Sequence, residues 1–96
     1  MSFIEPTFKK IILELYQKER LTKDEIAAII EPQLKNFPSE TKKVEAYRSA
    51  NAYARFLEKA NYAIRFSHKG RDYTLQITKK GKEAAKKLKA MKNESS

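Results

Sequence analysis

The sequence predicts an α+β fold in which three helices precede a two-stranded β-hairpin and a closing helix. Three observations support this prediction. Apolar residues recur at helical spacing through the first two-thirds of the chain. From Ile64 to Ile77 they alternate with polar residues, the period of two typical of strands. Only two glycines occur, Gly70 and Gly81, and they fall where this alternation reverses and where it ends.

The 96 residues are enough for one domain with a modest core. We expect that domain to span residues 1–92, with residues 93–96 as a flexible tail. The first helix is expected from Thr7 to Glu19, with Pro6 in the first turn, where proline is tolerated. Its apolar stripe consists of Phe8, Ile11, Ile12 and Leu15.

The second helix is expected to begin after Thr22, which forms a capping box with Glu25 three residues later. Its inward side chains are Ile26, Ile29 and Ile30. Pro32 then disfavours continuation, so EPQLKNFPSE at residues 31–40 predicts one helical turn followed by a loop.

The third helix is expected from Glu40 to Ala60, with Ser39 as its N-cap. At 100° per residue its core face would hold Ala46, Tyr47, Ala50, Tyr53, Ala54, Leu57 and Ala60. The opposite face would hold Thr41, Glu45, Arg48, Ala52, Arg55 and Lys59, with Ser49 and Asn51 at its margins. Asn61 stands where a left-handed residue normally ends a helix.

Residues 64–67 and 72–78 predict an antiparallel hairpin folded symmetrically about Lys69 and Gly70. Gly70 would supply the positive φ that a tight turn requires. This register would place four apolar residues on the core side, Phe66 opposite Tyr73 and Ile64 opposite Leu75.

The closing helix is expected to be capped by Thr78. Its inward residues would be Ala84, Ala85, Leu88 and Met91. Gly81 would lie in the first turn, where the backbone passes close to a neighbouring segment.

Charge is distributed unevenly along the chain. The net charge of +9 comprises −1 over residues 1–34 and +10 over residues 35–96. Self-repulsion of this size destabilises a compact chain, and an anionic partner is the usual reason for it. The charge therefore favours nucleic acid as the partner.

Several functional classes find no support in the residues. The chain lacks cysteine, which excludes disulfides, thiolate zinc sites and cysteine nucleophiles, and it has one histidine. No glycine-rich phosphate loop, carboxylate pair or nucleophile–base set is visible, so we expect no enzyme activity, no cofactor and no metal. With no signal peptide and no apolar run of about 18 residues, a cytoplasmic, nucleoid-associated location is expected.

Two segments carry a resemblance to a known family. FLEKANYAI, residues 56–64, resembles the end of a winged helix-turn-helix recognition helix, with Asn61 in place of the usual glycine. YTLQITKKGKEA, residues 73–84, is similar to the segment that closes the wing in MarR-like, PadR-like and small archaeal regulators. The resemblance covers Thr7 to Met91 and implies the winged-helix fold and binding of double-stranded DNA. The low glycine and high lysine and glutamate content also resembles that of hyperthermophile proteins.

The resemblance implies a role for specific side chains. The third helix would enter the major groove with Arg48, Asn51, Arg55 and Lys59, and the small Ser49 and Ala52 would let its backbone approach the bases. The hairpin would be the wing, with Arg65, His68, Lys69 and Arg71 on phosphates. Lys79 and Lys80 start the closing helix, where cations oppose the helix dipole, which suggests a compensating anion.

A transcriptional regulator is the favoured function. The alternatives are a nucleoid or architectural protein without sequence preference, an RNA- or ribosome-associated module, and a protein-interaction winged helix. A homodimer through the first and last helices is also expected, with candidate contacts at Phe3, Ile4, Leu13, Leu88 and Met91.

Overall fold

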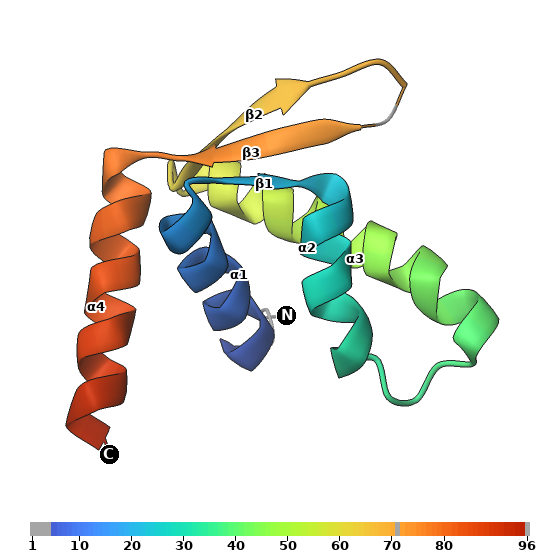
Figure 1. Cartoon of the computed structure of the whole chain (residues 1–96), viewed down its shortest axis with the longest axis horizontal. Coiled ribbons are helices and arrows are strands. Elements are labelled where there is room, and N and C mark those ends of the chain that lie inside the picture. The colour runs from blue at the N-terminus through green and yellow to red at the C-terminus, as the bar shows by residue number, and fades with distance from the viewer. Residues whose placement is uncertain (1–4, 71, 96) are drawn as a thin grey trace.

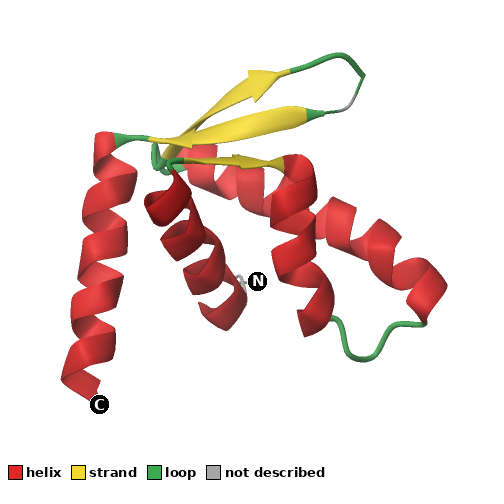
Figure 2. Ribbon diagram, viewed as in Figure 1, coloured by secondary structure: helices red, strands yellow, loops and turns green. Residues whose placement is uncertain are grey.

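A computed structural model describes residues 5–70 and 72–95, with side chains for residues 6–70 and 72–90. Within these residues the chain forms four α-helices, one 3-10 turn and a three-stranded antiparallel sheet, so the predicted α+β class is confirmed (Figure 1). The elements in order are α1 (Glu5–Lys18), β1 (Arg20–Thr22), α2 (Lys23–Ile30), η1 (Glu31–Gln33), α3 (Ser39–Lys59), β2 (Ala63–Ser67), β3 (Tyr73–Ile77) and α4 (Lys79–Ser95). The sheet covers one end of the helical layer, and α4 stands beside α1 (Figure 2).

Local sequence signals explain most helix ends. The capping box is confirmed, since Thr22 Oγ1 accepts from the Glu25 N–H at 3.2 Å and the Glu25 carboxylate accepts from the Thr22 N–H at 3.0 Å. Asn61 has the predicted positive φ of 64°. The Gly81 N–H donates to Thr78 Oγ1 at 3.1 Å, which confirms Thr78 as the cap of α4.

The ends of three helices differ from expectation. α1 begins at Glu5 rather than Thr7 and ends at Lys18 rather than Glu19, which has a positive φ of 68°. Ser39 is not the N-cap of α3 but its first residue, because Pro38 occupies the cap position with extended backbone (φ −60°, ψ 152°) and makes no side-chain cap bond. The N–H of Thr41 donates instead to the Pro38 carbonyl oxygen at 3.1 Å. α4 continues to Ser95, so residues 93–95, expected in a tail, are helical.

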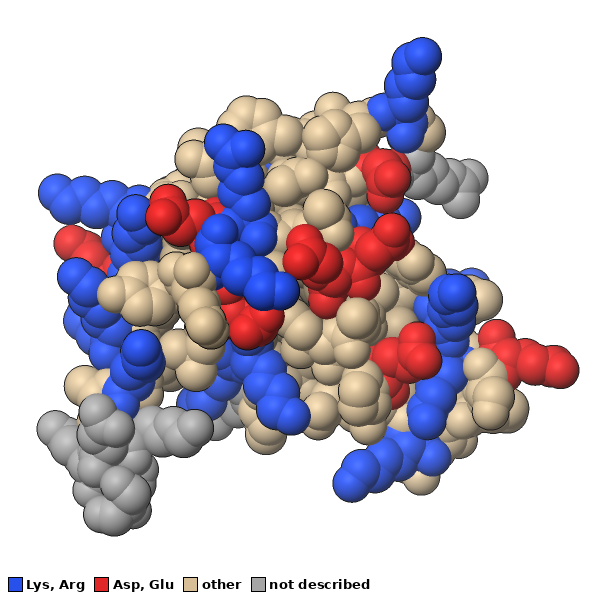
Figure 3. Space-filling model, in the orientation of Figure 1, with Lys and Arg blue, Asp and Glu red and all other residues tan. Residues whose placement is uncertain are grey.

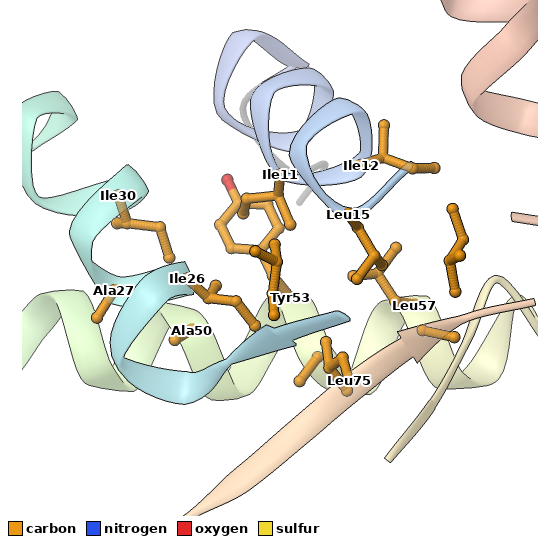
Figure 4. Packing of buried hydrophobic residues seen from close by; sticks show 14 of the residues in the cluster. Ile11, Ile12, Leu15, Ile26, Ala27, Ile30, Ala50, Tyr53, Leu57 and Leu75 are labelled. Atoms are coloured by element: carbon orange, nitrogen blue, oxygen red, sulfur yellow. The ribbon is translucent and has the colours of Figure 1, made fainter. Parts of the chain in front are cut away.

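The core forms where the inner stripes of α1, α2 and α3 meet beneath the sheet. Figure 4 shows Ile11 and Leu15 of α1 close to Tyr53 and Leu57 of α3. The buried apolar residues are Ile11, Ile12, Leu15, Leu21, Ile26, Ala27, Ile30, Ala46, Ala50, Tyr53, Ala54, Leu57, Ala63, Tyr73, Leu75, Ile77 and Ala85. Several residues expected to face inward are only partly buried, namely Phe8, Ile29, Tyr47, Ala60, Ala84 and Leu88. Met91 has no described side chain.

The sheet has a strand that the sequence did not predict. Residues Arg20–Thr22 form β1, and the strand order is β1-β3-β2. β1 is antiparallel to β3, with Leu21 opposite Leu75, and both side chains are buried. The strand that closes the hairpin is therefore the central strand of the sheet.

The hairpin forms, but its predicted register is wrong by one residue. Phe66 lies opposite Thr74, whereas Tyr73 lies opposite Ser67. The hairpin closes with the His68 N–H donating to the Asp72 carbonyl oxygen at 2.9 Å, so its centre is Gly70 (φ 74°) rather than the Lys69–Gly70 bond. A shift of one residue moves one strand's side chains to the other face.

The shift changes which apolar residues of the hairpin are buried. β3 keeps Tyr73, Leu75 and Ile77 in the core, as expected. Ile64 and Phe66 of β2, expected to be buried, are instead 53% and 48% exposed.

None of the helices in residues 5–70 and 72–95 is long and apolar enough to cross a membrane.

Candidate nucleic-acid interface

The predicted recognition residues lie along the side of α3 that does not pack in the core. Arg48, Arg55 and Lys59 are exposed, whereas Ser49 and Asn51 are partly buried at the margin. The Arg48 side chain is 75% exposed and its Nη1 lies 3.2 Å from Glu45 Oε1, one turn earlier. An exposed ion pair of this kind holds its partners weakly, so Arg48 can turn toward another anion.

A groove of about 270 Å³ separates α3 from the hairpin. Its lining comprises Lys23, Asn51, Arg55, Arg65, Ser67, Gly70, Asp72 and Tyr73. The fold thus brings together three predicted site residues, Asn51, Arg55 and Arg65, from two elements. The sequence did not single out Lys23, because the segment from Thr22 to Glu25 was interpreted only as a helix cap. The position of Lys23 directly after the capping residue could have indicated its role.

Arg65 ties the hairpin to α3. Its Nε and Nη2 donate to one Glu58 oxygen, Oε2, at 3.0 and 2.7 Å. Its guanidinium carbon lies 4.7 Å from the centre of the Tyr73 ring, within the range of a cation–π contact. Arg65, expected to bind phosphate, therefore fixes the position of the hairpin relative to the helix.

Tyr73 forms part of the groove wall. Burial raises the pKa of Tyr73 to about 12, an effect that Glu58 reinforces and the positive charge of Arg65 opposes. The buried hydroxyl is consequently neutral, and it has no hydrogen-bond partner among the described residues.

Lys23 occupies a defined position at the start of α2. Its Nζ lies 5.5 Å from the Tyr47 ring centre and 5.8 Å from that of Tyr73. The Tyr47 hydroxyl in turn donates to Asp24 Oδ1 at 2.6 Å, which raises the pKa of Tyr47. Two aromatic rings therefore position a cation at the edge of the groove.

The tip of the hairpin carries the remaining predicted wing residues. Lys69 and His68 are exposed. A ring nitrogen of His68, Nε2, lies 2.8 Å from Thr74 Oγ1, which anchors the imidazole to β3. Arg71, also predicted here, lies outside the described residues.

The cations at the start of α4 lie apart from the hairpin tip, because α4 begins where β3 ends (Figure 1). Lys79 and Lys80 are exposed, and Lys80 Nζ is 5.8 Å from the Tyr62 ring centre. Figure 3 shows Lys and Arg side chains gathered over α4, with acidic side chains nearer the centre of the same face. The described site residues thus lie in four places: the groove, the exposed side of α3 beyond it, the tip of the hairpin and the base of the hairpin.

The groove offers ammonium, guanidinium, amide and hydroxyl donors, which suit phosphate oxygens and base edges. Asp72 is the single carboxylate among the residues described there. The part of the chain that the structure describes contains no group of three or more His, Asp or Glu residues that could hold a metal ion.

No family model, curated protein or solved structure matches the chain.

Proposed function

We propose that the chain is a double-stranded DNA-binding protein of the winged-helix type and acts as a transcriptional regulator. α3 occupies the major groove, and the β2–β3 hairpin is the wing. The observation that supports this most is the groove in which Asn51 and Arg55 of α3 face the hairpin across a donor-rich space. The element order, three helices followed by a hairpin and a closing helix, also supports it.

The dimensions and chemistry of α3 suit a major groove. A helix with its side chains is about 10–12 Å across, and the B-DNA major groove is about 12 Å wide. α3 has 21 residues, and its outward side carries Arg48 and Arg55 with Ala52 exposed between them. Arginine forms bidentate hydrogen bonds with guanine and asparagine with adenine, so Arg48, Asn51 and Arg55 can distinguish base pairs.

Selection of bound duplexes from a random library tests the proposal. A defined site should emerge, and Arg55→Ala should weaken binding to it by about 1–3 kcal/mol while relaxing the preference at one position. Lys87→Ala, which removes an exposed cation of α4, is the matched control and should leave the preference unchanged. Equal losses from both variants on every duplex would contradict base recognition by α3.

The wing has a separate signature. Lys69→Ala combined with Arg71→Ala should weaken binding about equally on all duplexes, because phosphate contacts carry no sequence information. The dependence of log affinity on log salt should become shallower by up to about two phosphate contacts. An unchanged affinity and salt slope would show that the hairpin tip does not touch DNA.

A duplex-binding protein without sequence preference is the second candidate. The exposed lysines of α4 favour it, because they offer charge but no bidentate donors: Lys79, Lys80, Lys86, Lys87 and Lys89. Competition among a selected site, random duplex and structured RNA distinguishes the three functions. A regulator prefers the selected site, a protein without sequence preference binds both duplexes equally, and an RNA-associated protein prefers the RNA. Failure to bind any of them at low salt would leave a protein-interaction module.

A further inference from the structure

The outer face of the sheet, turned away from the helices, carries apolar side chains that the core does not use. Because directly opposed residues on neighbouring strands share a face, Phe66, Thr74 and Thr22 form one row across it. Ile64, Gln76 and Arg20 form the next row. An exposed phenylalanine therefore stands among polar and cationic neighbours on an open sheet.

A hollow of about 340 Å³ lies on this face, lined by Arg20, Phe66, His68 and Thr74. Phe66 is 48% exposed, so much of its ring remains accessible. The contact of His68 Nε2 with Thr74 Oγ1 at 2.8 Å holds the imidazole at the rim. No carboxylate is found among the described residues that line the hollow. The site combines an aromatic face, a permanent cation and a second aromatic ring.

We propose that this hollow binds an unpaired base of a single-stranded nucleic acid. The base stacks on the Phe66 ring, and the Arg20 guanidinium binds the adjoining phosphate. Stacking on exposed aromatic residues of a sheet, combined with nearby cations, is a general way for proteins to bind single strands. The net charge of +10 over residues 35–96 is complementary to such a strand.

A nucleic acid strand suits this face better than a second copy of the chain. In a two-fold contact the same patch lies on both subunits. Contact through Phe66 would place the Arg20 guanidinium groups of both copies in one interface, and like charges brought together are unfavourable. The negative phosphates of a strand instead gain from the charge of Arg20.

Binding of a single strand at the outer face is an activity separate from the proposed binding of duplex DNA by α3. Arg65, Ser67 and Tyr73 line the groove that faces α3, whereas Phe66 points from the opposite face of the same hairpin. Binding of a blunt duplex through α3 does not require the outer face, and binding of a single strand there does not require the groove. The two proposals can therefore fail separately.

The test uses a short fluorescent single strand of mixed sequence and an otherwise identical strand that carries abasic sites, measured by anisotropy at low salt. Phe66→Ala should weaken binding of the intact strand by about tenfold, the lower part of the range for loss of one stacked base. It should change binding of the abasic strand less than about twofold, because the phosphates remain. The affinity for a blunt duplex should also change by less than about twofold. An RNA strand of the same sequence shows whether the sugar affects binding.

The chain supplies a matched control and a direct probe. Phe37→Ala removes another exposed phenylalanine, 42% accessible, in the loop before α3, and should leave single-strand affinity unchanged. Phe66→Trp should retain affinity, and because the chain has no tryptophan, quenching of its fluorescence by the intact strand would report stacking directly.

Several results would overturn the proposal. One is the absence of single-strand binding by the native chain at low salt. Another is an equal loss on the intact and abasic strands for Phe66→Ala, or an equal loss for Phe37→Ala. Concentration-dependent self-association that Phe66→Ala abolishes, with oligonucleotide affinity unchanged, would assign the face to a second copy. Circular dichroism of Phe66→Ala confirms that any loss arises in a folded protein.

Discussion

At Gly81 the structure predicts how the addition of a Cβ atom changes the stability of the protein. It lies in the first turn of α4, where a Cβ would overlap the Tyr62 carbonyl oxygen and lie 2.8 Å from Ile77 Cγ1. That carbonyl already accepts the Thr78 N–H at 3.0 Å, so it cannot move without breaking the connection between the end of α3 and the start of α4. The space is therefore available only to glycine.

We expect Gly81→Ala to lower the free energy of unfolding by about 1–3 kcal/mol, the usual cost of overpacking. Helix propensity alone would give the opposite sign, since alanine is favoured over glycine by about 1 kcal/mol inside a helix. Denaturant titration measures the difference. Glu83→Ala, at an exposed position of the same helix, should change stability by less than about 0.5 kcal/mol. A more stable Gly81→Ala protein would refute the close contact with Tyr62.

Thr22 makes a second prediction at the scale of one side chain. Thr22→Ala removes the acceptor for the Glu25 N–H and should cost about 1 kcal/mol of unfolding free energy. Ser39→Ala is the matched control, because Ser39 lies inside α3 rather than at its cap, and should cost less than about 0.5 kcal/mol. Equal losses in denaturant titrations would mean that Ser39 also caps its helix.

Glu25 gives the same capping box a pH dependence. The Thr22 N–H donates to its carboxylate and, with Lys18 nearby, lowers the pKa of Glu25 below its ordinary value of 4.5. The stabilisation is therefore present above about pH 4.5 and is lost as the pH falls through the lower folded-state pKa. Glu25→Gln should remove this part of the acid-induced loss of stability in unfolding titrations at several pH values. Glu83→Gln should not.

Individual residues were predictable where their role is set by neighbours in the sequence. Thr22, Asn61 and Gly70 have roles that turn chemistry and capping rules assign directly. The role of Arg65 was not predictable, because its partner Glu58 is brought near by the turn between α3 and β2. Lys23 was missed for a similar reason, since its two aromatic neighbours come from α3 and β3.

At the scale of elements, the hairpin register decides which of two apolar residues is buried, although the alternating pattern placed both in the core. Leu75 is fully buried, whereas Ile64 is 53% exposed. Leu75→Ala should lower the free energy of unfolding by about 2–5 kcal/mol, and Ile64→Ala by less than about 1 kcal/mol. Thermal or denaturant unfolding of the two variants decides between the registers. Comparable large losses would restore the symmetric register with Ile64 in the core.

The helices were predictable because each repeats its apolar pattern over two or more turns, and because α2 and α4 also carry side-chain caps. β1 has only three residues, too few for a periodic pattern, and it exists because β3 offers it an edge. The register was not predictable, because alternation shows only which side chains of one strand share a face. Which residues of the two strands lie opposite each other depends on the geometry of the turn. The groove depends on that register, since it determines that Arg65 and Ser67 face α3.

For the whole molecule, the expected homodimer stays a prediction. Of its candidate contacts, Leu13 and Leu88 are partly buried and pack against the core. Phe3, Ile4 and the Met91 side chain lie outside the described part of the structure. Leu13 also lines an apolar groove of about 420 Å³ with Ile29 between α1 and α2, a surface that a second copy could cover.

Sedimentation at increasing concentration should reveal a weak or moderate dimer that Leu13→Lys disrupts while duplex affinity per protomer is retained. The charge of the variant opposes burial of that face in a dimer. Asn36→Lys, at an exposed position in the loop before α3 and away from this groove, controls for the added charge. A protein that stays monomeric at high micromolar concentration, both free and on DNA, would contradict the dimer and leave the assignment of α3 intact.

The central place of β3 has a consequence for how the chain acquires its structure. β1 pairs with residues more than fifty positions later, so the sheet cannot close until Tyr73–Ile77 has been added. Closing so long a loop costs chain entropy before any strand pairing compensates for it, which slows folding relative to a purely helical protein of this size. During synthesis on the ribosome, α1, α2 and α3 would therefore emerge before Tyr73, Leu75 and Ile77, which complete their shared core. One late segment of five residues then joins both edge strands of the sheet.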